Sequence, residues 1–194
     1  MPATSGGGDL RIHPRLAERL LREWRDHPSL RNAIALDRLA ELPDHLAELM
    51  VRDDTVRSIH IGTGGVPELD DMGALRGVPV RNDRPDLWDN RAGAFRDGRL
   101  LVGDIPAATV DLMAHELGHA ICVADHMASY HREFARLFRA ALPTAPRAWH
   151  DREEFFAEAW ASVFVQDDDR MVELTGTEDL AEHLWVWFAV RYAL

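Results

Sequence analysis

The chain has 194 residues, and 46% of them are hydrophobic, which is enough to bury the core of one domain. Its 33 acidic residues outnumber the 22 basic ones and give a net charge of −11, which argues against a nucleic acid or an anionic membrane as partner. The single cysteine, Cys122, excludes an internal disulfide and a cysteine-rich zinc site.

Residues 1–9 are rich in Gly, Ser and Thr, and we expect them to be disordered. They lack the basic and apolar regions of a secretory signal peptide, and no apolar run in the chain is long enough to span a membrane. We therefore expect a cytoplasmic protein, or one exported by a route without a cleaved signal.

In the first 50 residues, most apolar side chains are spaced as on one face of a helix. Leucines and a tryptophan at helical spacing predict a helix from about His13 to His27. A second helix is expected to begin after Ser29, which can cap it, and to end at Pro43. A short third helix is expected through Met50.

Strands are expected between these helices and residue 102. The alternating, β-branched segment Thr55–Ile61 predicts a strand, and a long Gly/Pro/Asp-rich loop follows from Gly62 to Asn90. The dipeptide Asp97-Gly98 separates two short apolar segments, 93–95 and 100–102, and predicts a β-hairpin.

The most informative stretch follows this hairpin and reads His115-Glu116-Leu117-Gly118-His119. Residues four apart lie on one face of a helix, so the two histidines can bind one zinc ion. Glu116 is then placed to take a proton from a zinc-bound water. The pattern also arises by chance, but apolar flanks and a helix start at Thr109 or Asp111 favour a metal-binding helix.

Helices are also expected in the last third of the chain. One is predicted from Ser129 to about Leu142, and a second from an Asp151 cap to about Val165. After a polar break at 166–169, an apolar C-terminal helix with Leu184 and Tyr192 is expected to pack in the core.

A catalytic zinc site usually has a third protein ligand, and two candidates compete for that role. Glu154 and Glu158 share a helix face, so one could bind zinc while the other holds the far nitrogen of a ligating histidine. Asp125, six residues after His119, would give the arrangement of snapalysin-like zincins. Those proteases have a glycine where Cys122 stands, so the sequence favours Glu154.

The two motifs, His115 to Ile121 and Glu154 to Ala159, resemble the catalytic domain of anthrax lethal factor and the bacterial Pro-Pro endopeptidases. The resemblance covers about residues 55–165. It implies a gluzincin-type zinc endopeptidase in which Glu154 is the third ligand, Glu158 supports a ligating histidine and Glu116 is the general base.

Two departures from this family concern catalysis. The family has Asp where this chain has Cys122, and an oxyanion-stabilising Tyr where it has Arg147. Arg147, or His150 nearer to Glu154, could supply the same electrostatic stabilisation.

We therefore expect an α+β, zincin-like domain, mostly helical, with a small sheet or hairpin before the active-site helix. Residues 10–194 would form one domain, with a helical scaffold at 10–52, a catalytic core at 55–165 and C-terminal helices at 166–194. One zinc ion per chain and a peptide or protein substrate are expected, whether the protein is an effector or a processing peptidase. The substrate is expected to pair with an edge strand around Arg99 to Asp104.

Two other interpretations remain. The chain could be a zinc-stabilised binding domain without catalysis, which the absence of the family's Tyr favours. The N-terminal helices could also serve a peptidase as a docking module.

Overall fold

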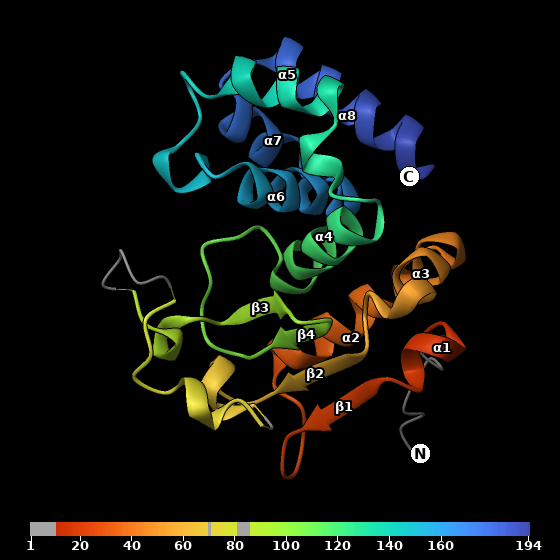
Figure 1. Ribbon diagram of the computed structural model, residues 1–194, viewed down its shortest axis with the longest axis vertical. Coiled ribbons are helices and arrows are strands. Elements are labelled where there is room, and N and C mark those ends of the chain that lie inside the picture. The colour runs from red at the N-terminus through yellow and green to blue at the C-terminus, as the bar shows by residue number, and fades with distance from the viewer. Residues whose placement is uncertain (1–10, 70, 81–85) are drawn as a thin grey trace, which may run out of the picture.

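The computed structural model describes residues 11–69, 71–80 and 86–194, so the disorder expected at residues 1–9 lies outside the described residues. The fold has the expected α+β class, with many helices and a small sheet that precedes the helix of the His-Glu motif (Figure 1). The helices are α1 (Pro14–Ala17), α2 (Leu30–Glu41), α3 (Asp44–Val51), α4 (Leu112–Ala124), α5 (Arg132–Ala141), α6 (Arg152–Val165), α7 (Asp168–Thr175) and α8 (Glu178–Tyr192). The strands are β1 (Leu20–Glu23), β2 (Ser58–Gly62), β3 (Gly93–Arg96) and β4 (Arg99–Val102).

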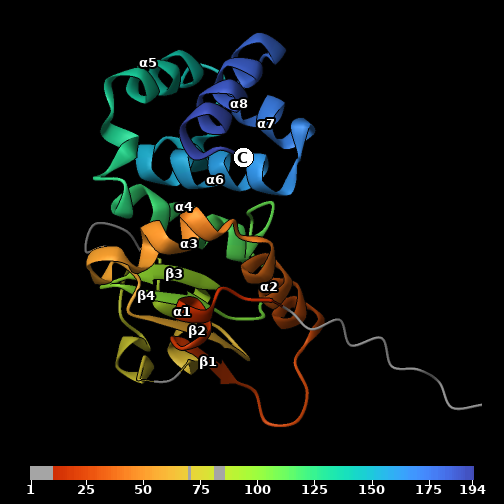
Figure 2. The same cartoon turned by 90° about the vertical axis from the view of Figure 1, so that its right-hand side faces the viewer.

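Helices α4 and α6 occupy the middle of the molecule. The sheet lies on one side of them with α1, α2 and α3, and α5, α7 and α8 lie on the other side (Figures 1 and 2). Helix α4 contacts both the sheet and α6. Most of its side chains are buried, as expected for a helix that is apolar around most of its surface.

The sheet has the strand order β1-β2-β4-β3, with parallel pairs β1/β2 and β2/β4 and an antiparallel pair β4/β3. Leu100 of β4 is paired with Ile59 on one side and with Phe95 on the other. The expectation of an edge strand around Arg99 to Asp104 is therefore wrong. The expectation failed because the β2/β4 pairing joins distant segments and cannot be inferred from the hairpin alone.

Strand β1 also differs from the prediction. The expected helix from His13 to His27 ends after the short α1, and Leu20–Glu23 forms a strand beside β2. The backbone N–H of Ile59 donates to the carbonyl of Arg19 at 2.8 Å, and Nδ1 of His60 lies 2.6 Å from a carboxylate oxygen of Glu23. These distant contacts override the helical spacing of the leucines.

Several local predictions are confirmed. The hydroxyl of Ser29 caps α2 by accepting from Asn32 N at 3.2 Å, and α3 ends at Val51, near the predicted position. Asp97 and Gly98 both have positive φ, 49° and 70°, as a tight hairpin turn requires.

The caps of the two central helices also agree with the sequence. Asp111 Oδ1 accepts from Ala114 N at 2.9 Å at the start of α4. Asp151 Oδ1 accepts from Glu153 N at 3.0 Å at the start of α6. Both helices therefore begin close to where the sequence places them.

The sheet has a core on each face. Ile59, Ile61, Leu100 and Val102 belong to the large core with residues of α2, α3 and α4. On the other face, Leu101 packs in a smaller cluster with Val66, Leu69, Met72 and Trp88, which lie in or beside short 3-10 helices of the long loop. This part of the predicted loop is therefore packed against the sheet.

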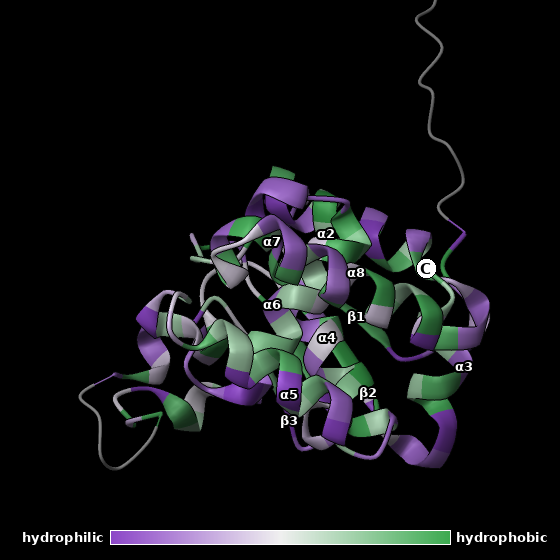
Figure 3. Ribbon diagram, turned by 90° about the horizontal axis from the view of Figure 1, so that it is seen from above, coloured by the Kyte–Doolittle hydropathy of each residue, from purple (hydrophilic) through white to green (hydrophobic). Residues whose placement is uncertain are grey.

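The C-terminal helix α8 buries Leu184, Phe188 and Tyr192, which confirms its predicted place in the core. Its outer side carries the exposed Val186 and Val190. Figure 3 shows the resulting mixture of hydrophobic and hydrophilic residues along α8 and α5. Within the described residues, none of the helices has the length and apolar character needed to cross a membrane.

Candidate metal centre

The backbones of α4 and α6 approach each other closely at Gly118. A Cβ atom at this position would lie 2.9 Å from both Cα and O of Ala157, closer than Cβ atoms are normally found. The helices are antiparallel, because His115 lies beside Glu158 while His119 lies beside Glu154. The two small residues therefore allow the polar side chains of both helices to meet.

The side chains of His115, His119 and Glu154 converge on one point. Their ligand atoms all lie within 4.8 Å of one another. The Nε2 atoms of the two histidines are 3.2 Å apart, and Glu154 Oε2 is 3.4 Å from the first and 3.7 Å from the second. Ligand atoms about 2.1 Å from a tetrahedral zinc ion lie about 3.4 Å apart, so these residues fit that ion.

Glu158 contacts the ring of His115 at Nδ1, the nitrogen that faces away from the convergence point. Its carboxylate is fully buried, and its Oε2 lies 3.0 Å from Nδ1 of His115. The carboxylate also accepts from Thr109 Oγ1 at 2.5 Å, from Val110 N at 3.1 Å and from Arg170 Nε at 2.6 Å. With Nδ1 as donor to Glu158, the Nε2 atom of His115 faces the convergence point.

The carboxylates around His115 favour positive charge at this point. Burial alone would lower the pKa of His115, but hydrogen bonds with Glu154 and Glu158 and the charge of Glu116 raise it to about 10. Burial likewise opposes ionisation of Glu154, yet the two histidines bring the pKa of Glu154 well below its usual range. The donor set therefore has the electrostatic character of a cation site.

Glu116 stands apart from this hydrogen-bonded set. Its side chain is buried, and its Oε2 has no hydrogen-bond partner among the described residues. Burial raises the pKa of Glu116, although His115, His119 and Arg91 oppose the shift. A Cβ at Gly93 would lie 3.0 Å from Glu116 Oε1, so the start of β3 lies directly against this carboxyl group.

The alternative ligand Asp125 is engaged elsewhere. It follows the last residue of α4, and its Oδ2 accepts from Arg191 Nε at 2.5 Å and from Tyr192 OH at 2.9 Å. Helix α4 continues through Cys122 without a break, and Asp125 is absent from the ligand cluster formed by the described residues.

The two candidate oxyanion stabilisers lie in and just after a short 3-10 helix, Arg147–Trp149, that precedes α6. Arg147 is exposed, and its side chain has no hydrogen bond or ion pair with the part of the chain that the structure describes. His150 directs Nε2 to the carbonyl of Ala145 at 3.0 Å. Neither residue therefore contacts the three candidate ligands in the structure.

Sequence reasoning missed the residues that support Glu158. Thr109, Val110 and Arg170 bind its carboxylate, and the ring of Trp149 lies 5.8 Å from that of His115. A buried carboxylate needs partners that compensate its charge. Arg170, which follows the polar break after α6, was the residue in the sequence that could have suggested such a partner.

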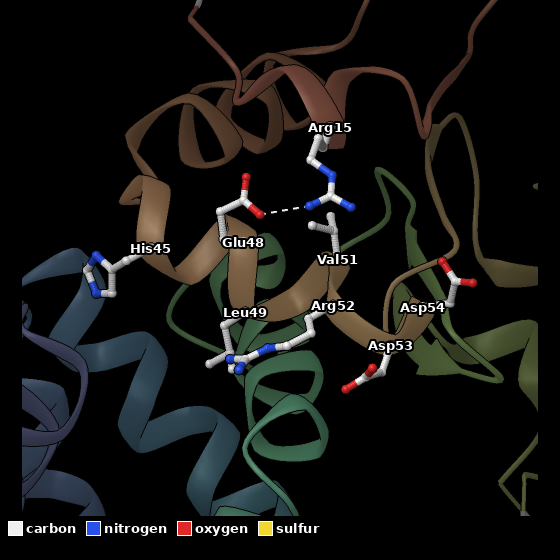
Figure 4. Close-up of a pocket in the computed structure, with 8 residues that line it drawn as sticks. All are labelled: Arg15, His45, Glu48, Leu49, Val51, Arg52, Asp53 and Asp54. Carbon is white, nitrogen blue, oxygen red and sulfur yellow. Dashed lines mark hydrogen bonds and ion pairs between the residues drawn. The ribbon is translucent and has the colours of Figure 1, made fainter.

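A hollow elsewhere on the surface lies between α1, α3 and the turn after α3 (Figure 4). It contains none of the predicted site residues, and its Glu48 is paired with Arg15 at 2.8 Å. Its lining residues are Arg15, His45, Glu48, Leu49, Val51, Arg52, Asp53 and Asp54.

Comparison with known proteins identifies a similar fold. No protein-family model and no curated protein matches the chain. A solved structure of the Pro-Pro endopeptidase PPEP-2 from Paenibacillus alvei matches with a TM-score of 0.68 and 19% identity, covering 89% of this chain and 98% of that one. The chain therefore has the α+β fold of that endopeptidase.

Proposed function

We propose that this protein is a zinc-dependent endopeptidase in which His115, His119 and Glu154 hold the metal and Glu116 is the general base. The observation that carries the proposal is the convergence of three ligand atoms beside a buried carboxyl group that lacks a partner among the described residues. The fold shared with a Pro-Pro endopeptidase supports the same conclusion.

Zinc bound at this point would lower the pKa of a water molecule and polarise the peptide carbonyl. Glu116 would accept the proton of the attacking water and deliver it to the leaving nitrogen. Its burial suits this task, because burial raises the pKa of Glu116 and so makes the carboxylate a better proton acceptor. Glu158 holds the imidazole of His115 in the orientation that presents Nε2.

We further propose that the substrate binds as an extended strand along β3 rather than β4. Strand β3 is hydrogen bonded to β4 on one side, and it is at the end of the sheet on the other. Because Gly93 at its start lies against Glu116, a peptide paired with this edge would pass the general base. Peptides with consecutive prolines are the first substrates to test, given the name of the structural neighbour.

Elemental analysis of the purified protein tests the metal ligands. We expect about one zinc per chain in the wild type and in Asp125→Ala, and loss of the metal in Glu154→Ala. The Asp125 variant is the matched control, because it removes the alternative ligand. Zinc lost with Asp125→Ala and kept with Glu154→Ala would refute the proposed ligand set.

The variant Glu116→Gln tests the proposed base. It keeps the size of the side chain but cannot accept the proton, so peptide cleavage should fall by at least 100-fold while zinc stays bound. The assay compares cleavage of a peptide library with the zinc content of the same samples. Cleavage close to wild-type level by this variant would contradict the mechanism.

Hydrogen exchange with and without a bound peptide tests the edge strand. In the inactive Glu116→Gln variant, a peptide should slow exchange of β3 amides. Strand β1, at the other end of the sheet, is the internal control and should not change. Protection of β1 alone would show that the substrate binds elsewhere.

A zinc-stabilised binding domain without catalysis is the second candidate function. It is favoured by the exposed Arg147, which stands where the resembling family has its oxyanion-stabilising Tyr. This alternative predicts wild-type protein that binds zinc but cleaves no member of the library.

A further inference from the structure

Arg170 of α7 joins three parts of the metal centre that are distant in sequence. Its Nε donates to Glu158 Oε1 at 2.6 Å, and its NH2 group donates to the carbonyl of Ala108 at 3.0 Å. Its guanidinium lies over the ring of Trp149, 5.2 Å from the centroid. The side chain is 16% exposed; its bond to Glu158 is partly buried, whereas its bond to Ala108 is exposed.

The contact with Glu158 balances a buried charge. A fully buried carboxylate is costly unless a cation and hydrogen bonds compensate it. Among the described residues, Arg170 is the arginine that forms an ion pair with Glu158. The remaining donors to this carboxylate are the uncharged groups of Thr109 and Val110 and the ring of His115.

The contact with Trp149 involves a second neighbour of His115. The Trp149 ring is 8% exposed and lies 5.8 Å from the His115 ring at an interplanar angle of 55°. Arg170 therefore touches two of the groups that border this imidazole, the carboxylate at Nδ1 and the indole beside the ring. It does so without contacting the imidazole itself.

We propose that Arg170 is a positioning residue of the metal centre. By balancing Glu158 and packing on Trp149, it holds the His115 imidazole with Nε2 directed at His119 and Glu154. This inference rests on the proposed zinc site and adds α7 to the elements that build it.

Zinc affinity, measured by competition with a chromogenic chelator, tests the proposal without any activity assay. Loss of a residue that orients a ligand typically weakens metal binding about 10- to 100-fold, and we expect a loss of that size for Arg170→Met. Arg170→Lys keeps the charge but loses the planar set of donors, so it should restore part of the affinity. The matched control is Glu173→Ala, which removes the exposed ion pair of Arg170 at 2.7 Å and should leave the affinity unchanged.

A double-mutant cycle separates positioning from a general loss of stability. If Arg170 acts through Glu158, then Arg170→Met should weaken zinc binding much less in a Glu158→Gln background than in the wild type. An equal effect in both backgrounds would overturn the proposal. If Arg170→Met does not fold, the same cycle is run with Arg170→Lys.

The outcomes also distinguish this inference from the proposed function. A wild-type protein that binds no zinc overturns the proposed function and the inference together. If Arg170→Met binds zinc as tightly as the wild type does, while Glu158→Gln binds it weakly, the inference alone is overturned.

Discussion

Two glutamates beside the proposed metal ligands, Glu158 and Glu116, have different environments. Although burial opposes ionisation of Glu158, the hydrogen bond and charge of His115, the hydrogen bond of Thr109 and the charge of Arg170 lower its pKa overall. Glu116 is also buried, but its Oε2 lacks a partner among the described residues, and its pKa is raised. Divergent pKa shifts of neighbouring acids are what the proposed function requires, with Glu158 as a fixed charge and Glu116 as the carrier of an exchangeable proton.

At the same scale, we predict that zinc binding releases a proton. In the metal-free protein the pKa of His115 is raised from 6.5 to about 10, so its imidazole is protonated at pH 8. A metal ion must displace that proton. Calorimetric titrations at pH 8 in buffers of different ionisation enthalpy should therefore show release of about one proton per zinc.

The same shift predicts how pH affects the metal-free protein. Because the folded-state pKa of His115 lies above the unfolded value, the stability that this group contributes is fully present below pH 6.5. It is lost as the pH rises through about 10. Metal-free protein that becomes more stable across this interval in urea unfolding would contradict the assignment.

At the scale of elements, the contact between α4 and α6 determines whether the ligands can meet. The contact depends on Gly118, where a Cβ atom would lie 2.9 Å from the backbone of Ala157. Such a clash forces two well-packed helices apart, and helix backbones cannot yield as a flexible side chain does.

Gly118→Ala should therefore weaken zinc binding and lower the free energy of unfolding by about 1–3 kcal/mol. The direction of the change in the free energy of unfolding is informative, because in the interior of an unstrained helix a Gly→Ala substitution raises it by about 0.5–1 kcal/mol. Gly73→Ala is the matched control, since a Cβ at Gly73 would meet nothing within 4 Å. Chelator competition and urea unfolding of both variants measure the two effects.

The sequence predicted elements whose signals are local. Ser29, Asp111 and Asp151 begin helices through their own side chains, and Asp97-Gly98 forms a turn with its own backbone. Helix spacing also predicted which side chains of α4 and α6 share a face.

What the sequence could not predict depends on contacts between distant segments. Strand β1 forms because β2 accepts it as a partner, although its leucines have helical spacing. The order of strands, and with it the exposed edge, follows from the parallel pairing of β2 with β4. Arg170 reaches the proposed metal centre only when α7 folds back onto the loop before α4, and Trp149 only when the segment before α6 packs beside His115.

At the scale of the whole molecule, the last helix is tied to the middle and to the beginning of the chain. Tyr192 OH donates to Asp125 at 2.9 Å, and the carbonyl of Tyr192 lies 2.7 Å from Nε2 of His45 on α3. Helix α8 thereby contacts the end of α4 and the N-terminal helices at once. These bonds support the assembly of the helices rather than the metal ligands.

Tyr192→Phe should therefore lower the free energy of unfolding by about 1–2 kcal/mol and leave zinc affinity unchanged. The chain has one other tyrosine, Tyr130, which is 53% exposed and donates to Glu153 at 3.0 Å. Tyr130→Phe is thus a control that removes a hydroxyl from the surface and should have almost no effect. A zinc affinity that falls in Tyr192→Phe would show that Asp125 takes part in the metal centre.

The placement of Arg170 has a consequence for biosynthesis. His115 and His119 leave the ribosome about 50 residues before Arg170, a delay of about 3–10 s at ordinary rates of translation. During that time the nascent chain carries the two imidazoles first without Glu154 and Glu158 and then, until residue 170 has been added, without the guanidinium. If Arg170 positions the proposed zinc site, we expect the site to reach its final geometry only after α7 has emerged. A cotranslational pause before residue 170 would then prolong the time in which the histidines are open to other metals.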